Sequence, residues 1–121
     1  MSKVVSLADE RIYLFALEGN LKEVRKHIIG GGNVLASHPI HNGDTALHAA
    51  CANGHLDVCK YLCSVGANEH HGNDKGNVPL HYAVKNGHLK IVFQLIKILI
   101  IGMFQVLIIL KIVLKIVDLM M

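Results

Sequence analysis

The sequence predicts an all-α fold: a solenoid of stacked helix-turn-helix units with hairpin loops, ending in a long apolar C-terminal helix. The first observation is that Gly43–Ala50 and Gly76–Ala83 recur in register at a spacing of 33 residues. The second is the tetrapeptide Asn-Gly-His-Leu, which occurs at 53–56 and again at 86–89. The third is the strongly apolar composition of residues 96–121. A fixed period of this length indicates an array in which each helical pair buries its apolar face against its neighbours.

Two helices are predicted before the clear repeats begin. Apolar side chains follow helical spacing over 7–17, and Glu18-Gly19-Asn20 interrupts the pattern. A second short helix is expected over 21–29, and Gly30-Gly31-Gly32-Asn33 ends it because glycine supplies left-handed C-cap geometry. Aligned on its Gly-Asn-Leu, this unit lies 35 residues ahead of the next one. It is therefore a degenerate first repeat with a longer loop.

The second unit carries the clearest helix signals. Residues 34–44 form a polar loop, and Thr45 is a suitable N-cap for a helix over 46–52. Asn53-Gly54-His55 then turns the chain into a partner helix over 56–64.

The third unit begins like the second but does not end like it. After a polar loop over 69–77, Pro79 fits the first position of a helix over 79–85, where its missing N–H has no cost. Another helix begins at Leu89. Counting 33 residues on from Gly66-Ala67-Asn68 predicts a helix stop at 99–101, but that position reads Leu99-Ile100-Ile101.

From about residue 7 to residue 98 the chain resembles ankyrin-repeat proteins, with about three repeats. We expect a degenerate N-terminal repeat at 1–42, a repeat at 43–75, a partial or degenerate repeat at 76–98 and a hydrophobic tail at 99–121. The matching motif residues are Thr45, Leu47, His48, Gly54, His55, Pro79, Leu80, His81, Gly87 and His88. The resemblance implies that Thr45 and His48 hydrogen-bond to each other and brace the adjoining loop.

The same resemblance implies an inter-repeat core and some weak points in it. The leucines expected to form that core are Leu47, Leu56, Leu62, Leu80, Leu89 and Leu95. In the third repeat Val78 replaces the threonine, and the lost N-cap costs about 1 kcal/mol. His27 stands where a core leucine is usual, and Cys59 and Cys63 replace larger apolar residues, so we expect a short array of marginal stability.

Composition excludes several classes of function. The net charge of +3 is scattered, whereas a nucleic-acid-binding protein needs a basic stripe on one face. The three cysteines have no disulfide-like spacing, and no signal core follows Met1, so reduced thiols and a cytoplasmic location are expected.

Metal binding and catalysis find little support. His55, Cys59 and Cys63 share one helical side, but the repeat alignment places the histidine in the turn and the cysteines in the core. No complete zinc ligand set is visible, and no nucleophile–base pair or phosphate-binding loop stands out. We therefore expect no metal, no cofactor and no enzymatic activity. His70-His71 is either a solvated loop tip or a contact for a partner or stray metal.

The expected function is protein–protein interaction through the concave side of the array. The candidate partner-binding residues are Asn42, Asp44, Ala52, Asn53, Lys75, Asn77, Tyr82, Lys85 and Asn86. Tyr82 is the one aromatic residue among them, and aromatic residues are enriched at binding hot spots. An equally weighted alternative is that Tyr82 only packs against its neighbours. The sequence does not name the partner.

The tail leaves several alternatives open. The uncharged run over 98–110 is only 13 residues, and a bilayer span needs about 20, so a span must include Lys97 or Lys111 and Lys115. At ~100° per residue, the strongly polar residues from Leu89 onward fall within one arc of about 140°. One long amphipathic helix could use residues 91–117 to fold back over the array, self-associate or lie in a membrane. The tail could instead mark a truncated or frame-shifted fragment of a longer ankyrin protein.

Overall fold

The computed structural model describes residues 5–121, and every regular element in that part of the chain is helical. The helices occur where the sequence predicts them, with α1 one residue longer than expected at its C-terminal end. The 3-10 turn within the first polar loop was not predicted. The elements are α1 (Leu7–Glu18), α2 (Leu21–Ile29), η1 (Pro39–His41), α3 (Ala46–Ala52), α4 (Leu56–Ser64), α5 (Pro79–Lys85) and α6 (Leu89–Met120).

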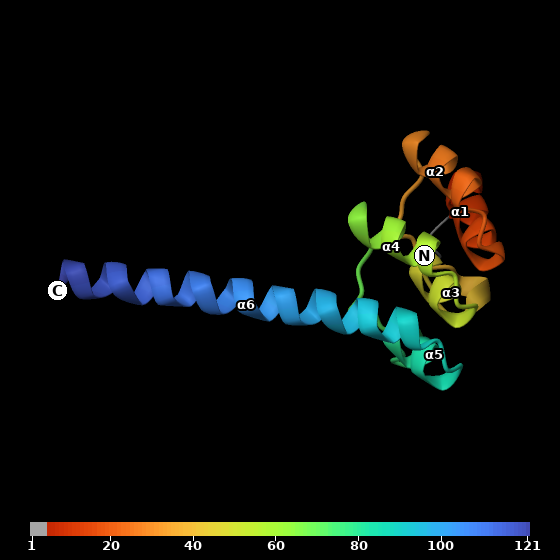
Figure 1. Cartoon of the computed structure of the whole chain (residues 1–121). Coiled ribbons are helices and arrows are strands. Elements are labelled where there is room, and N and C mark those ends of the chain that lie inside the picture. The colour runs from red at the N-terminus through yellow and green to blue at the C-terminus, as the bar shows by residue number, and fades with distance from the viewer. Residues whose placement is uncertain (1–4) are drawn as a thin grey trace.

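The helices form two layers. The first helices of the three pairs, α1, α3 and α5, pack side by side as an inner layer, and α2, α4 and the start of α6 pack behind them as an outer layer. From this array α6 continues outward as a single long helix, on the side of the outer layer (Figure 1). The result is a short solenoid with one projecting arm.

Small and branched apolar side chains build the core between the layers. Ala49, Ala50 and Ala83 are buried, and their short side chains let neighbouring helices approach closely. Leu47 and Leu62 are fully buried in the second repeat, which confirms them as core residues. Cys59 is also fully buried and behaves there as a small hydrophobic residue.

The prediction that Leu89 is a core residue is wrong. Leu95 is buried, and Leu56 and Leu80 are half-buried against the core, but Leu89 is 65% exposed. Leu56 is covered because the third helical pair packs beside it, whereas no further pair packs beside Leu89 in the described residues. A leucine at this register is a core residue only when a following repeat is present.

The repeats are joined by a hydrogen-bonded clamp that recurs with the sequence period. The side chains of Asn53 and His55 both donate to the carbonyl of Leu17, at 2.8 Å and 3.0 Å. One repeat later, Asn86 and His88 donate to the carbonyl of Ala52 at the same two distances. The Asn-Gly-His turn therefore fastens each of these two repeats to the one before it.

Helix ends follow the predicted signals with two refinements. Thr45 caps α3: its hydroxyl accepts from the backbone N–H of His48. Val78 precedes α5 and has no acceptor on its side chain, so the side-chain cap is missing. The backbone N–H of Val78 donates to His81 Nδ1 at 2.9 Å, and the N–H of His81 donates to the Val78 carbonyl at 3.0 Å. After α2 the left-handed glycine is Gly31, with φ of 102°, not Gly30.

Beyond the array α6 has no partner in the described residues. Ile91 and Leu95 are buried against the other helices, and Ile98 and Leu99 are half-buried. Every residue from Ile100 to Met121 is exposed. By length and composition alone, α6 qualifies as a helix that could cross a membrane.

Candidate partner-binding face

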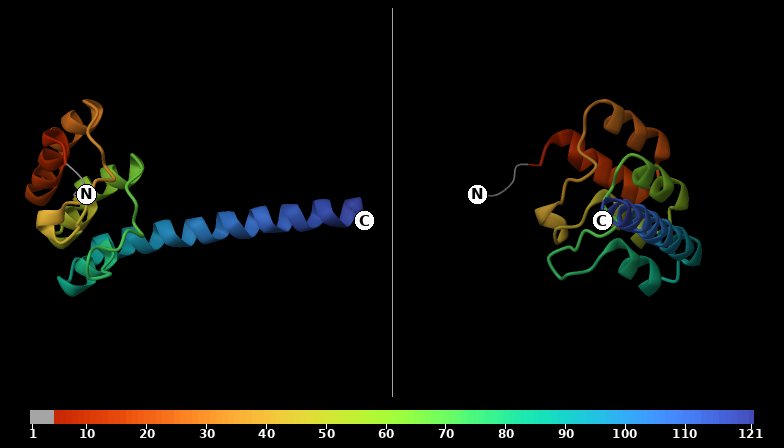
Figure 2. Two further views of the ribbon diagram at one scale, coloured as in Figure 1. Left: turned by 180° about the vertical axis from the view of Figure 1, so that it is seen from behind. Right: turned by 90° about the vertical axis from the view of Figure 1, so that its left-hand side faces the viewer.

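Two polar loops, 34–44 and 69–77, lie at the same edge of the array (Figure 2). The start of the second loop, Glu69 and His70, lies against α6. Within the first loop the backbone N–H of His38 donates to the carbonyl of Asp44, which closes the chain around η1. The two loops are joined where the N–H of Asp74 donates to the carbonyl of Asn42 at 2.9 Å. We call these loops, with the inner-helix residues they touch, the loop face.

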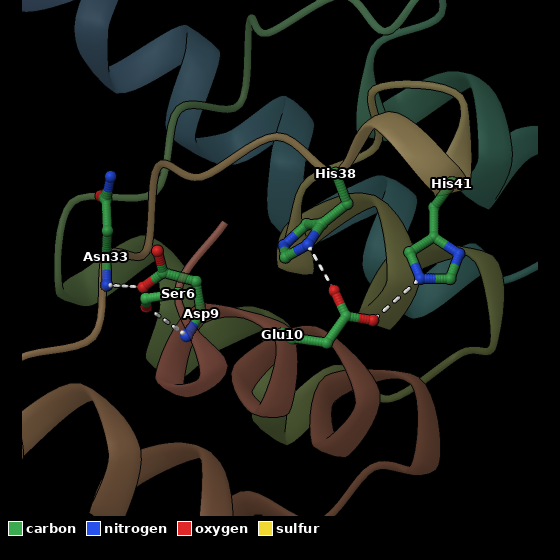
Figure 3. A network of polar contacts seen from close by, with 6 residues as sticks. All are labelled: Ser6, Asp9, Glu10, Asn33, His38 and His41. Atoms are coloured by element: carbon green, nitrogen blue, oxygen red, sulfur yellow. Dashed lines mark hydrogen bonds and ion pairs between the residues drawn. The ribbon is translucent and has the colours of Figure 1, made fainter. Parts of the chain in front are cut away.

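A carboxylate on α1 holds the first loop in place. Glu10 Oε2 accepts from His38 Nδ1 at 3.1 Å, and its Oε1 accepts from His41 Nε2 at 3.2 Å (Figure 3). The ring of Tyr13, one turn along α1, stacks on the His41 ring with centroids 4.2 Å apart. In the same view, Asp9 accepts from the backbone N–H of Asn33, so α1 holds the loop at two points.

Burial and hydrogen bonding have opposite effects on the pKa values of the side chains in this cluster. Burial raises the pKa of Glu10, but the hydrogen bonds and charges of His41 and His38 outweigh it, so this pKa lies below its ordinary value. Burial lowers the pKa of His38 below its ordinary value despite the neighbouring carboxylate. Burial is also the main reason that the pKa of Tyr13 rises to about 12.

Sequence reasoning missed this cluster. Glu10 is separated from its two histidine partners by 28 and 31 residues, and its register is occupied by Thr45 in the second repeat. One signal was available: His38 and His71 are 33 residues apart. His71 lies edge-on to His48 with ring centroids 6.0 Å apart, and at the same register His38 lies tilted against Tyr13 with ring centroids 4.8 Å apart.

A second polar network joins the two loops to α5. Asn73 Nδ2 lies 2.8 Å from both Asp44 Oδ1 and the hydroxyl of Tyr82. That hydroxyl in turn donates to Asp44 Oδ1 at 3.1 Å. Burial and then the Asp44 carboxylate raise the pKa of Tyr82 above its ordinary value. Tyr82 thus packs within the loop face, and its role as an aromatic anchor for a partner stays a prediction.

A third connection runs through His48. Its Nδ1 accepts from the backbone N–H of Thr45 at 3.1 Å and lies 2.9 Å from the threonine hydroxyl. Its Nε2 donates to the carbonyl of Asn77 at 2.8 Å. The expected bracing of the loop by Thr45 and His48 is therefore present, and it reaches the loop of the following repeat.

The predicted partner-binding residues fall into three groups. Asn42, Lys75 and Lys85 have exposed side chains. Asp44, Asn77 and Tyr82 are half-buried and brace the loop face from within. The remaining three belong to the clamp between repeats: Asn53 and Asn86 use their side-chain amides there, and Ala52 offers its carbonyl.

The structure brings only part of this set together. Asp44, Asn77 and Tyr82 meet through the loop networks, and Asn42 and Lys75 lie in the same two loops. Lys85 lies at the C-terminal end of α5 instead. Sequence reasoning missed Ile40 in η1, which is 80% exposed; an isoleucine in a polar loop was the available signal.

The cysteines and His70 contact only one or two polar neighbours each in the described part of the chain. Cys51 Sγ and Cys59 Sγ lie 3.8 Å apart in the core. The hydrogen bond with Cys51, opposed by one from Cys63, and burial together raise the pKa of Cys59 to about 12. His70 is exposed beside Glu69 at 3.6 Å. Over residues 5–121, no group of three or more His, Cys, Asp or Glu side chains is placed to hold a metal ion.

Comparison with known proteins gives one curated relative of note. The chain is 37% identical over 60 residues to "Protein phosphatase 1 regulatory subunit 27" of Mus musculus. The match covers 50% of this chain and 38% of that protein, so it spans well under half of the relative's length.

The family is shown by a longer match. A model of ankyrin repeats in three copies matches residues 12–102, which is most of the chain. The match leaves out residues 7–11 of α1 and residues 103–120, more than half of α6. The matched segment contains the period of 33, the Thr45–His48 cap and both Asn-Gly-His clamps. The chain belongs to the ankyrin-repeat family.

Proposed function

We propose that this chain is a non-catalytic interaction module that binds another protein through the loop face. The observation that carries the proposal is the network that fixes both loops before any partner arrives, in which Asn73 bridges Asp44 and Tyr82. A surface that is already ordered loses less conformational entropy on association. Ankyrin repeats are typically interaction modules, which supports the same function.

The exposed residues of the loop face supply the contacts. Ile40 offers apolar area on η1, with Asn42 two residues away. Lys75 lies in the second loop, which is bonded to the first through Asp74. An apolar centre with polar groups at its rim is the usual composition of a protein interface. We therefore place the contact at Ile40, Asn42 and Lys75, with Asp44, Asn77 and Tyr82 as its support.

The test compares two matched double substitutions. Ile40→Asp with Lys75→Glu alters the loop face, and Ile29→Asp with Lys22→Glu makes the same changes on α2, where Ile29 is 81% exposed and Lys22 is also exposed. Partners co-precipitated with the full chain are quantified by mass spectrometry. We expect the loop-face variant to lose its partners and the α2 variant to keep them. The opposite pattern would place binding on the outer layer and overturn the proposal.

The curated relative suggests a first partner to test. That mouse protein is named as a regulatory subunit of protein phosphatase 1. We propose the catalytic subunit of that phosphatase as a candidate partner, to be measured by direct titration against the full chain in detergent micelles. Binding that the loop-face variant loses supports the candidate, and absence of binding at micromolar concentrations rejects this partner.

A second function, membrane anchoring through α6, is favoured by a separate observation. The exposed part of the helix, from Ile100 to Met120, is about 30 Å long at ~1.5 Å per residue, which matches the hydrocarbon core of a bilayer. The region 98–117 contains fifteen Ile, Leu, Val and Phe residues. Each favours insertion by about 0.3–0.6 kcal/mol, and together they exceed the ~2.5–3.5 kcal/mol cost of one lysine at the centre of a span. Both Lys111 and Lys115 lie in this region, and Lys115, two residues from its end, can extend its ammonium group to the interface.

Charge gives the orientation of the proposed anchor. Lys85, Lys90 and Lys97 lie on the array side of the apolar stretch, whereas Lys111 and Lys115 lie within its last third and no lysine or arginine follows Lys115. Positive residues flanking a span favour the cytoplasmic side, so we propose that the array faces the cytoplasm. Carbonate extraction of cells expressing the full chain tests this: a membrane-anchored chain stays in the pellet, and release into the supernatant rejects the anchor.

A further inference from the structure

Lysines gather around one hollow where α6 leaves the array. The hollow has a volume of about 230 Å³ and lies between α4 and α6. Its lining consists of Leu56, Lys60, Lys90, Phe93, Gln94 and Lys97. The lining includes three cationic groups and no carboxylate, so it attracts an anion.

Helical geometry explains why these side chains meet. Lys90, Gln94 and Lys97 are four and then three residues apart, which places them on one face of α6. Lys60 projects toward them from α4, which packs against the start of α6. None of the three lysines forms an ion pair with a carboxylate anywhere in residues 5–121, and all three are exposed.

The height of the hollow along α6 matters as much as its charge. Leu95 is the last buried residue of the helix, and the uncharged run begins one residue after Lys97. Phe93 is 70% exposed between the lysines. If the uncharged run enters a bilayer, the lysines lie at the level of the headgroups, and an exposed aromatic ring is favoured at that level.

The groove on another side of the same helix has the opposite character. It is lined by Glu69 and His70 together with apolar residues of α6 from Ile98 to Leu107. A carboxylate at the rim disfavours a phosphate there. The hollow with the three lysines combines positive charge, an aromatic ring and the junction between array and apolar helix.

We propose that Lys60, Lys90 and Lys97 bind the phosphate of an anionic phospholipid headgroup in the leaflet that α6 enters. The site rests on the proposed membrane anchoring. Each lysine close to an anionic surface strengthens the attraction by about fivefold, and the effect weakens as ionic strength rises. The site would fix the array against the membrane on the side of α4, leaving the loop face free for a protein partner.

The experiment measures lipid selectivity of the full chain in bilayers. Wild-type chain is reconstituted in nanodiscs, and spin-labelled phosphatidylserine and phosphatidylcholine are compared by their relative association at physiological ionic strength. A variant with Lys60→Gln, Lys90→Gln and Lys97→Gln removes the site. A control with Arg11→Gln, Lys22→Gln and Lys26→Gln removes three exposed cations from α1 and α2. Far-UV circular dichroism verifies that both variants keep their helical content.

The expected result is a preference for phosphatidylserine of at least about fivefold in wild type and in the control, and of about one in the site variant. Equal preference in wild type and the site variant would overturn the headgroup site. So would an equal loss in both variants, because that outcome reports net charge only. Competition by inorganic phosphate as effective as that of added anionic lipid would also overturn it, by assigning the lysines to a free anion.

Membrane anchoring by α6 is tested separately from the headgroup site, by flotation of the chain with vesicles. A chain that does not co-float with vesicles of either composition rejects membrane anchoring, whatever the lysines bind. A chain that floats with both compositions but shows no lysine-dependent preference keeps the anchor and rejects the headgroup site.

Discussion

The imidazole of His48 lies 2.8 Å from the carbonyl oxygen of Asn77 and donates to it through Nε2. Its other nitrogen accepts from the backbone N–H of Thr45, so both sides of the ring are used. His81 occupies the same register one repeat later, and its Nδ1 accepts from Val78, but its side chain is exposed and no further loop meets it in the described residues. The second repeat is therefore braced by the third, whereas the third lacks such a brace.

The missing cap of α5 can be restored by one substitution. Val78 has φ of −86° and ψ of 163°, close to the −96° and 172° of Thr45, so a threonine fits the same conformation. We expect Val78→Thr to raise the free energy of unfolding by about 1 kcal/mol, because its hydroxyl can cap α5 as Thr45 caps α3. Urea unfolding followed by tyrosine fluorescence measures this, since all three tyrosines lie in the array.

Thr45→Val is the matched control for this prediction. It removes the hydroxyl from the second repeat without changing side-chain volume, and we expect a loss of about 1 kcal/mol or more. If Thr45→Val destabilises the array while Val78→Thr leaves it unchanged, the hydroxyl acts through His48 rather than through capping.

Two glycines one period apart separate backbone strain from contact between repeats. Gly54 and Gly87 have nearly equal positive φ, 76° and 73°. A Cβ added at Gly54 would lie 2.7 Å from the ring of His88, whereas one added at Gly87 would meet nothing within 4 Å. We expect both alanine variants to lose about 1–2 kcal/mol for the left-handed backbone.

The difference in unfolding free energy between the two glycine variants measures how much the clamp contributes to stability. Gly54→Ala must also displace His88 from the Ala52 carbonyl, so we expect it to cost a further ~1–3 kcal/mol. The same tyrosine-monitored unfolding measures both variants. Equal losses at the two positions would show that the histidine moves aside without cost and that the clamp adds little.

The buried thiols are predicted to be unreactive in the folded chain. Cys51 and Cys59 are fully buried, and the hydrogen bond between them and burial raise the pKa of Cys59 to about 12, although Cys63 opposes this. The hydrogen bond from Cys59, followed by burial, also raises the pKa of the half-buried Cys63. Because the thiolate is the reactive form, we expect slow labelling by Ellman's reagent in native buffer and rapid labelling of all three in urea. Rapid native labelling of Cys51 or Cys59 would show that the core opens readily.

Structural features that recur with the 33-residue period, such as helix bounds, could be predicted from the sequence. Contacts that occur at one place in the array could not. The helix bounds follow from glycine turns, Thr45 and Pro79, which act locally, and the period places them in register. The Glu10–His38–His41 cluster was missed because a carboxylate replaces the usual threonine and its partners are distant in sequence. Leu89 was misassigned because its burial depends on a neighbouring repeat rather than on its own position.

Acid is predicted to destabilise the array through its buried histidines. Burial lowers the pKa of both His38 and His48 in the folded chain below the ordinary value of 6.5. The unfolded state therefore takes up protons first as pH falls. The stability that these neutral rings provide is fully present above pH 6.5 and is lost as pH falls through their lowered pKa values. Glu10, whose pKa is also lowered, adds a further loss only below its ordinary value of 4.5.

The check is the slope of unfolding free energy against pH below 6.5 in wild type, His38→Gln and His81→Gln. A glutamine side chain cannot titrate, so we expect a shallower slope in His38→Gln together with lower stability at neutral pH from the weakened contact with Glu10. His81 is exposed and makes no contact with a following loop in the described residues, so His81→Gln should keep the wild-type slope. A slope that is unchanged in His38→Gln would assign the acid sensitivity to His48 alone, and a stability that rises on acidification would contradict the predicted direction for both rings.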